Sequence, residues 1–338
     1  MAYNVTLQPS GHQFSAAADT PLLQSALDAG LTLPHGCRDG ACGACKATLI
    51  EGHVDHGKAQ EHALPLSERA SGSLLTCCAR PLSDLVLKVK EVSSQTDYPI
   101  KQLPCRVQEL QRVAEDVMIM HLKLPGNEPF AFRAGQYIEF LLPEGKRRAF
   151  SLANAPHETG IIELHVRHIA GGTFTAQIFS EMKVKDILRF EGPLGTFHLR
   201  EDSEKPMILV AGGTGFAPIK GLVEYAIHQG IRRPMTLYWG ARNRAGLYLN
   251  DLAEQWVADH PHIRYVPVLS EPDAADAWTG RTGLVHEAVL QDFPRLQEFQ
   301  AYVCGAPIMV EAALRDFVTH GLPGDEFFAD IFSYATKR

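Results

Sequence analysis

Apolar and polar residues alternate along YNVTLQ, residues 3–8, close to the start of the chain. A period of two predicts a strand with one buried face. The stretch TPLLQSALDAG, residues 20–30, then has a proline where a first helical turn would begin and a glycine where the helix would end. Two more strand-like runs follow, at residues 46–52 and 85–92. Residues 1–92 therefore predict a small domain that mixes strands with a helix.

The middle of the chain is rich in short β-type runs that are separated by turn residues. Six such runs lie at residues 105–113, 117–124, 136–142, 148–154, 161–169 and 187–192. Short strands at this spacing favour a small antiparallel β-barrel over residues 104–200, interrupted by one helix from about Thr173 to Met182. Residues 93–103, SSQTDYPIKQL, mix turn formers with charge and lack an apolar period, which predicts a linker.

In the last part of the chain, strand-like and helix-like runs alternate. They lie at residues 206–213, 218–230, 235–241, 247–260 and 263–270. This is the βαβ pattern of a parallel sheet covered by helices. We therefore expect a multidomain chain of α+β and α/β type, whose third domain, residues 201–338, is a parallel-sheet α/β domain.

Composition agrees with this division and narrows the classes of function. A chain of 338 residues is too long for one ordinary core, and 45% hydrophobic with 21% charged residues is typical of a soluble globular protein. The net charge of −7 without a basic block disfavours nucleic-acid binding. No apolar run approaches the roughly 18 residues that a membrane span needs. The first residues show no basic segment followed by an apolar one, so we expect a cytoplasmic protein.

Three of the seven cysteines lie in one short stretch, HGCRDGACGACK. The spacing Cys37-x4-Cys42-x2-Cys45 is that of a plant-type [2Fe–2S] cluster. Thiolates are the ligands that iron–sulfur clusters prefer, and the interleaved glycines let the backbone curl closely around the cluster.

A structural zinc site is the alternative, because zinc also binds four thiolates. Zinc sites more often use two Cys-x2-Cys pairs. Here the second pair would be the adjacent Cys77 and Cys78, which is poor geometry for one metal ion. The spacing therefore favours the iron–sulfur cluster.

Two glycine turns precede predicted helices. In the barrel, Gly171 and Gly172 open a helix whose N-terminal amides suit a phosphate, although an ordinary turn would explain this pair as well. In the third domain, LVAGGTGFAP, residues 209–218, runs from a strand through a glycine turn into a helix. Such a turn allows close approach to a pyrophosphate, but it is not the G-x-G-x-x-G fingerprint.

Residues 1–92 resemble plant-type ferredoxins in the segments CRDGACGAC and LLTCCARPLSD, which implies a β-grasp fold. In that family the last ligand is the cysteine that corresponds to Cys77, which completes the set Cys37, Cys42, Cys45 and Cys77. If LLTCCAR is near-extended, neighbouring side chains point to opposite sides. Cys78 would then pack as a small apolar residue.

The barrel segment RRAFSLAN resembles the Arg-x-Tyr-Ser stretch of the ferredoxin–NADP reductase superfamily. The resemblance implies that Arg148 pairs with the FAD pyrophosphate and that Ser151 lies near the reactive edge of the flavin. Phe150 stands at the usual tyrosine position, where it can pack on the flavin but cannot donate a hydroxyl hydrogen bond.

Further motifs of that superfamily imply more FAD contacts. HVRHIAGGTFTAQ is similar to its second flavin motif, and FFADIF resembles its closing aromatic-acidic segment, with Asp330 near the flavin. Aromatic residues near a C-terminus also pack simply as core. The FAD contacts implied by these motifs are His165, Val166, Arg167, Gly171, Gly172, Thr175 and Phe332.

The third domain carries the superfamily's GGTG-x-AP and C-G-x-P-x-M motifs. The resemblance implies that Cys304 lies beside the nicotinamide, although a free cysteine is more commonly just a buried strand residue. Ser151 and Cys304 are therefore the candidate catalytic residues. The implied NAD(P)H contacts are Gly212, Gly213, Thr214, Gly215, Pro218, Arg242, Cys304 and Gly305. Ala241 replaces a serine that binds the 2′-phosphate in NADPH users, so we expect NADH, with NADPH possible through Arg242.

The order of the three domains resembles the reductase components of bacterial oxygenases, such as those of phenol hydroxylase and methane monooxygenase. It also resembles CDP-6-deoxy-hexulose dehydrase reductases. The resemblance implies an oxidoreductase in electron transport, which passes electrons from NAD(P)H through FAD and the cluster to an oxygenase or dehydrase component. The alternative is an iron–sulfur and flavin redox sensor without turnover.

Overall fold

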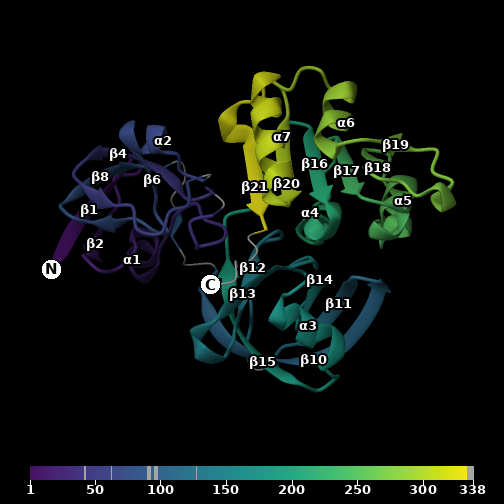
Figure 1. Ribbon diagram of the computed structural model, residues 1–338, viewed down its shortest axis with the longest axis horizontal. Coiled ribbons are helices and arrows are strands. Elements are labelled where there is room, and N and C mark those ends of the chain that lie inside the picture. The colour runs from purple at the N-terminus through teal and green to yellow at the C-terminus, as the bar shows by residue number, and fades with distance from the viewer. Residues whose placement is uncertain (42, 62, 90–92, 95–97, 127, 333–338) are drawn as a thin grey trace. The chain divides into compact units, whose positions relative to one another are not determined.

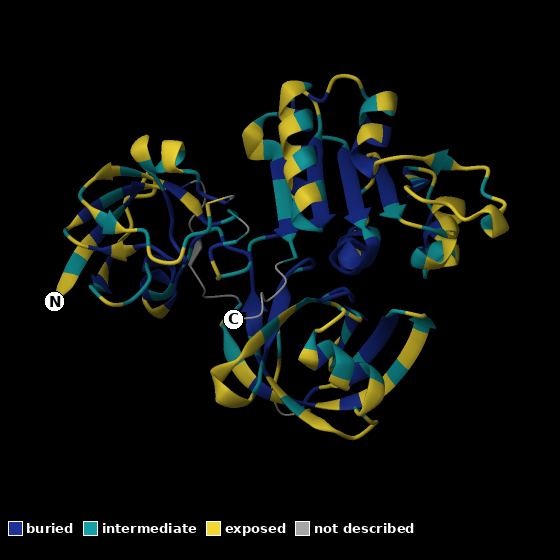
Figure 2. Ribbon diagram, viewed as in Figure 1, coloured by how far each residue is buried: buried dark blue, intermediate teal, exposed yellow. Residues whose placement is uncertain are grey.

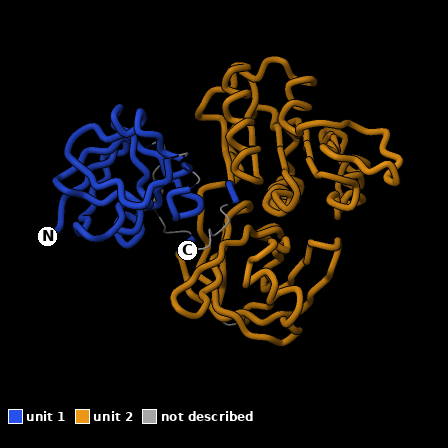
Figure 3. Tube along the Cα trace, viewed as in Figure 1, with its two compact units in different colours: residues 1–99, 331–338 blue, residues 100–330 orange. Residues whose placement is uncertain are grey.

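The computed structural model describes residues 1–41, 43–61, 63–89, 93–94, 98–126 and 128–332. The chain forms two compact units (Figure 3). One comprises residues 1–99 with the residues from 331 onward, and the other comprises residues 100–330. No helix among the described residues combines the length and the apolar character that crossing a bilayer requires.

The first unit is built on a five-stranded mixed sheet with the order β2-β1-β8-β4-β6 (Figure 1). Its strands are β1 (Ala2–Gln8), β2 (Gln13–Ala17), β4 (Lys46–Glu51), β6 (Ser73–Leu75) and β8 (Leu85–Lys88). β1 pairs in parallel with β8, and the other pairs are antiparallel. Helix α1 (Leu22–Asp28) buries Leu22 and Leu23, while the alternating Val5 and Leu7 of β1 are fully buried. This is the predicted ferredoxin-like β-grasp domain.

The barrel of the second unit is a six-stranded sheet with the order β13-β12-β15-β10-β11-β14. Its strands, all paired antiparallel, are β10 (Lys101–Ala114), β11 (Val117–Lys123), β12 (Tyr137–Leu141), β13 (Arg147–Ser151), β14 (Ile161–Arg167) and β15 (Ile187–Leu194). A single bridge between Leu152, directly after β13, and Leu164 of β14 brings the two edges of this sheet together. Helix α3 (Thr173–Ser180) lies where the sequence predicted a helix, and it contributes Phe174 and Ile178 to the barrel core.

The remainder of the second unit is the predicted nucleotide domain, a sheet with the order β19-β18-β17-β16-β20-β21. Its strands are β16 (Met207–Gly212), β17 (Met235–Ala241), β18 (Ile263–Leu269), β19 (Arg281–Thr282), β20 (Gln300–Gly305) and β21 (Phe327–Ile331). Strands β16 to β20 pair in parallel. The central strands are buried along nearly their whole length (Figure 2), which explains their continuous apolar runs.

Four α-helices of the described chain flank this parallel sheet. They are α4 (Phe216–His228), α5 (Asn250–Asp259), α6 (Val285–Asp292) and α7 (Pro307–Thr319). A 3-10 turn, η2 (Gly213–Gly215), joins β16 directly to α4, and α7 follows β20 after a single residue. The turns after β16 and β20 therefore both lie at the carboxyl edge of the sheet, where parallel α/β folds bind their ligands.

Strands occupy both ends of the segment predicted as a linker. β9 (Ser93–Ser94) pairs with β3 (Leu31–Thr32) in the first unit, and β10 begins at Lys101 and pairs with β15. Residues 95–97 lie outside the described residues. A two-residue pairing rests on main-chain hydrogen bonds, which a pattern of side chains does not reveal.

Candidate functional site

Three distant segments of the second unit meet at the carboxylate of Asp330. Ser151 is the last residue of β13 in the barrel, and its hydroxyl donates a hydrogen bond of 2.7 Å to Asp330 Oδ2. Cys304, near the end of β20, places its Sγ 3.7 Å from the same oxygen. Asp330 itself belongs to β21. The structure thus brings together the two predicted catalytic residues at the junction of barrel and nucleotide domain.

Burial controls the protonation of this group. It raises the pKa of Asp330 above its usual range, and the hydrogen bonds from Ser151 and Cys304 oppose that shift. Burial also raises the pKa of Cys304 well above its ordinary value, and the nearby carboxylate adds to the effect. Cys304 therefore stays a thiol at neutral pH and is not a thiolate nucleophile. It offers a compact neutral group at the carboxyl end of β20.

The predicted nucleotide-binding glycines lie in two turns that touch each other. A Cβ on Gly215 would lie 2.1 Å from the carbonyl oxygen of Cys304, and a Cβ on Gly305 would lie 3.3 Å from the Cα of Gly212. Larger residues would force these turns apart. Gly213 has a φ of 55°, and a Cβ there would lie 2.4 Å from Nη1 of Arg167. Packing within the protein therefore accounts for these glycines, besides any ligand.

The other predicted nucleotide contacts are spread along the same edge of the sheet. Thr214 is buried in η2, and Pro218 is buried in the first turn of α4. Arg242 follows the end of β17 and is exposed. These positions fit the predicted nucleotide-binding edge, but their contacts with NAD(P)H remain predictions.

The first flavin motif lies on β13. The ring of Phe150 packs between those of Phe140 and Phe174, at centroid distances of 5.7 and 6.0 Å. Arg148 donates a hydrogen bond of 2.7 Å to the carbonyl oxygen of Arg147. Residues two apart on a strand share a face, so Arg148 and Phe150 point to the same side.

The second flavin motif has most of its side chains turned into the protein. Val166 lies in the barrel core. His165 is buried, with Nε2 2.8 Å from Glu163 and Nδ1 2.8 Å from the hydroxyl of Tyr248. From these two residues only main-chain contact with a flavin is open. Arg167 pairs with Asp116 at 3.1 Å.

The glycine turn before α3 agrees with a phosphate-binding role. Gly171 has a φ of 76°, which favours glycine, and Gly172 caps the helix. The Thr175 hydroxyl accepts a hydrogen bond from the amide of Ile169 at 3.2 Å and so closes the turn. The first-turn amides are thereby held in place to face a phosphate. Phe332, which follows β21, is half-buried, and its contact with the flavin remains a prediction.

Three of the four predicted cluster ligands, Cys37, Cys45 and Cys77, lie among the described residues of the first unit. Cys37 is half-buried and Cys45, Cys77 and Cys78 are buried, all as free thiols, whereas Cys42 lies outside the described residues. The backbone curls at three positions with φ between 57° and 75°, Arg38, Gly40 and Gly43. An all-sulfur donor set on a tightly curled loop fits a [2Fe–2S] cluster.

The condition that LLTCCAR is near-extended is not met, because β6 ends at Leu75 and a turn follows. The amides of Cys78 and Ala79 both donate to the carbonyl oxygen of Leu75, at 3.0 and 2.8 Å. The turn places the sulfur atoms of Cys77 and Cys78 only 3.6 Å apart. Alternation of side chains therefore cannot decide which of them faces the cluster.

Local contacts separate the two thiols. The amide of Thr76 donates to the carbonyl oxygen of Cys45 at 3.1 Å, which holds the next residue, Cys77, beside this member of the predicted ligand set. The Cys78 sulfur packs against the cysteine loop, where a Cβ on Gly40 would lie 2.6 Å from it. These contacts support Cys77 as the fourth ligand and a packing role for Cys78.

Comparison with known domain families gives the same three parts in the same order. Residues 5–82 match the 2Fe-2S iron-sulfur cluster binding domain, and residues 104–199 match the oxidoreductase FAD-binding domain. Residues 209–315 match the oxidoreductase NAD-binding domain. The three predicted cofactors are confirmed.

Several characterised relatives cover almost the whole chain. The CDP-6-deoxy-L-threo-D-glycero-4-hexulose-3-dehydrase reductase of Yersinia pseudotuberculosis is 43% identical over 332 residues, which are 98% of this chain and 99% of the relative. The reductase component of phenol 2-monooxygenase from Pseudomonas sp. (strain CF600) is 38% identical over 338 residues, covering 98% and 94%. The crystal structure of a cytochrome P450 reductase from Amycolatopsis superposes with a TM-score of 0.81 at 36% identity, covering 99% and 100%.

Replacing the carboxylate of Asp330 should slow the reaction without lowering the stability of the fold. Because the pKa of Asp330 is higher in the folded than in the unfolded protein, its ionised carboxylate destabilises the fold at neutral pH. This cost disappears when the pH falls below the pKa that the carboxyl has in the unfolded protein. Asp330→Asn should therefore keep or raise the Tm at pH 7 while slowing flavin reduction by NADH roughly 10- to 100-fold. Glu311→Gln, on the exposed side of α7, is the control and should change neither. A wild-type reduction rate in Asp330→Asn would remove this group from the site.

The two neighbouring thiols should differ when each is replaced by serine. Cys77→Ser should lose most of the cluster, measured as about two iron and two acid-labile sulfide per chain in the wild type. It should keep FAD and reduce ferricyanide, but fail with cytochrome c. Cys78→Ser should keep the cluster at a modest cost in stability. The reverse result would make Cys78 the ligand, and a full cluster in both variants would mean that the two thiols substitute for each other.

Proposed function

The chain belongs to the family of iron–sulfur flavoprotein reductases of the ferredoxin–NADP reductase superfamily that carry an N-terminal [2Fe–2S] domain, and we propose that it supplies electrons to a deoxysugar dehydrase. It is an NAD(P)H-dependent oxidoreductase. The observation that supports this acceptor is the 43% identity to a CDP-hexulose dehydrase reductase along 98% of the chain. The relatives described above are named as reductases or reductase components, which favours turnover over a redox sensor.

The chain's own residues prepare the site for hydride transfer. When bound, the nicotinamide supplies a hydride, FAD accepts two electrons and releases them singly, and the cluster carries one electron at a time. Ser151 donates its hydroxyl hydrogen to the carboxylate of Asp330, which fixes the orientation of this hydroxyl. Cys304 remains neutral and, with the turn at Gly215, shapes the carboxyl edge of the sheet.

We further propose that the enzyme prefers NADH and acts in the cytoplasm. Ala241 offers no hydroxyl to a 2′-phosphate, and the exposed Arg242 is the residue of this stretch that could pair with one. Reducing conditions in the cytoplasm keep thiol ligands available. An oxygenase component is the second candidate acceptor, since the phenol 2-monooxygenase reductase is 38% identical to this chain.

The acceptor can be tested by reconstitution. We expect the holoenzyme with NADH to reduce a purified CDP-hexulose dehydrase at least tenfold faster than the oxygenase component of a phenol hydroxylase, measured as acceptor reduction under anaerobic conditions. Replacing NADH with NADPH should lower kcat/KM. Faster reduction of the oxygenase component would identify the second candidate, and a higher kcat/KM with NADPH would show that Arg242 dominates.

A further inference from the structure

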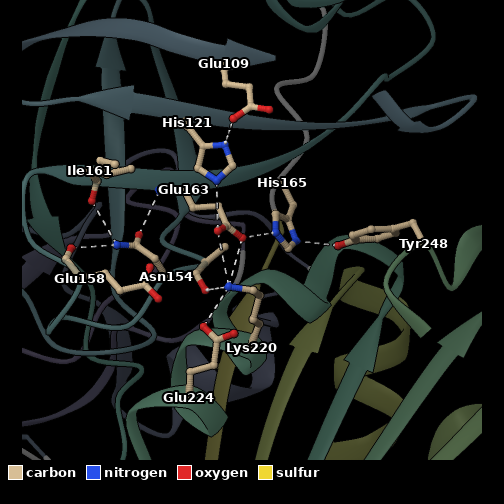
Figure 4. A network of polar contacts seen from close by, with 11 residues as sticks. Glu109, His121, Asn154, Glu158, Ile161, Glu163, His165, Lys220, Glu224 and Tyr248 are labelled. Carbon is tan, nitrogen blue, oxygen red and sulfur yellow. Dashed lines mark hydrogen bonds and ion pairs between the residues drawn. The ribbon is translucent and has the colours of Figure 1, made fainter. Parts of the chain in front are cut away.

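A network of buried polar side chains links the barrel to the nucleotide domain (Figure 4). Glu163 and His165 belong to β14 of the barrel. Lys220 belongs to α4, and Tyr248 lies between the 3-10 turn η3 (Arg244–Gly246) and α5, so both come from the nucleotide domain. The polar network therefore crosses from one domain to the other at two separate points.

The contacts within this polar network are short and shielded from solvent. Lys220 Nζ lies 3.2 Å from Glu163 Oε1, which also lies 2.8 Å from His165 Nε2. His165 Nδ1 then lies 2.8 Å from the hydroxyl of Tyr248. The side chains of His165, Lys220 and Glu163 are 0, 9 and 12% exposed. Two flanking groups complete the set, His121 on Glu163 at 3.3 Å and Glu224 on Lys220 at 2.8 Å.

The protonation states decide which groups of this polar network donate hydrogen bonds and which accept them. Burial alone would raise the pKa of Glu163, but the hydrogen bonds from His121 and His165 and the charge of Lys220 hold it well below its usual range. Burial lowers the pKa of His165, so its ring is neutral. The hydrogen on Nε2 faces the Glu163 carboxylate, and Nδ1 therefore accepts a hydrogen bond from Tyr248. Burial raises the pKa of Tyr248, which keeps that donor protonated.

The two crossing points flank the turn that begins the nucleotide site. Phe216 follows η2 directly, and Lys220 comes one helical turn later in α4. The ring of Phe216 stacks on Trp239 at 3.8 Å and meets the ring of Tyr248 edge-on at 6.2 Å. Phe216, the residue after the glycine turn, thereby contacts Tyr248, and Lys220 of the same helix contacts Glu163. Lys220 and Tyr248 are both anchored to β14 of the barrel.

Buried ionised groups are an expensive way to hold a fold together. A well-packed apolar cluster of similar volume is often as stable, whereas polar partners define one relative position of the groups they join. Resting on the reductase function proposed above, we propose that Tyr248 and His165 are positioning residues for hydride transfer. They hold the glycine turn and Cys304 at the separation from the flavin barrel that the reaction requires.

The reaction is sensitive to this separation. A hydride leaves C4 of the dihydronicotinamide with both electrons of the broken C–H bond and forms a new bond to the oxidised flavin. Misplacement by about 1 Å can cost about 100-fold in rate. Releasing one anchor should therefore slow the hydride step more than it weakens nucleotide binding.

Tyr248→Phe removes only the hydroxyl of the anchor. Mixed anaerobically with saturating NADH, the holoenzyme variant should bleach its flavin roughly 5- to 50-fold more slowly than wild type. It should keep FAD, the cluster and a Kd for NADH within about threefold of wild type. The isotope effect with NADH deuterated at C4 should increase, because hydride transfer limits the rate more completely.

Tyr265→Phe is the matched control. Its hydroxyl bonds the side chain of Asn250 at 3.1 Å, wholly within the nucleotide domain, so this variant should reduce flavin at the wild-type rate. Lys220→Met tests the other anchor and should slow flavin reduction, and Lys220→Arg should restore part of the rate. This pair keeps the test informative if Tyr248→Phe folds poorly.

The outcomes separate this inference from the proposed function. If wild type itself does not bleach with NADH, the reductase function fails. If wild type bleaches and Tyr248→Phe matches it in rate and isotope effect, the positioning role is wrong. Loss of FAD from both the Tyr248 and Lys220 variants would show a structural role only and would also overturn the proposal.

Discussion

The hydrogen bond between Ser151 and Asp330 constrains how the barrel and the nucleotide sheet of the second unit lie relative to each other. It requires the end of a barrel strand to reach a strand of the nucleotide sheet, inside the protein and at 2.7 Å. The Cys304 thiol shares the same carboxylate oxygen, so three segments are fixed to one point. Such a contact persists only if the barrel and the sheet hold a defined relative position. The buried polar network through Glu163 and His165 supplies a second connection between the same two domains.

The glycines at the carboxyl edge serve the same requirement. Gly215 lets the turn after β16 lie against the main chain of Cys304, and Gly213 leaves room for the guanidinium of Arg167 from the barrel. A glycine-rich turn is usually explained by the phosphate it binds. Here the first reason is the approach of protein to protein, because these glycines let β16, β20 and β14 lie close together at the carboxyl edge of the sheet.

Much of this architecture could be predicted from the sequence because the patterns are local. Alternation identified β1, the apolar runs identified β16 and β17, and the motif order gave three cofactor domains that the family comparisons confirmed. Contacts between distant residues were harder to predict. Nothing in the segment around Tyr248 indicates a partner 83 residues away in His165.

The turn at Cys77 shows the other limit of sequence analysis. An extended segment and a turn both accommodate LLTCCAR, and main-chain hydrogen bonds to Leu75 decide between them. The two ends of the predicted linker show the same limit, since β9 and the start of β10 are joined to their partners by main-chain pairing without an apolar period.

The most direct test of electron flow through the whole chain is an anaerobic titration of the holoenzyme with NADH, followed by flavin absorbance and by the EPR signal of the reduced cluster. FAD takes two electrons and the cluster takes one, so we expect flavin bleaching and a cluster signal that are complete at about 1.5 NADH per chain. Complete bleaching of the flavin without any cluster signal would contradict the account, because electrons would then stop at FAD.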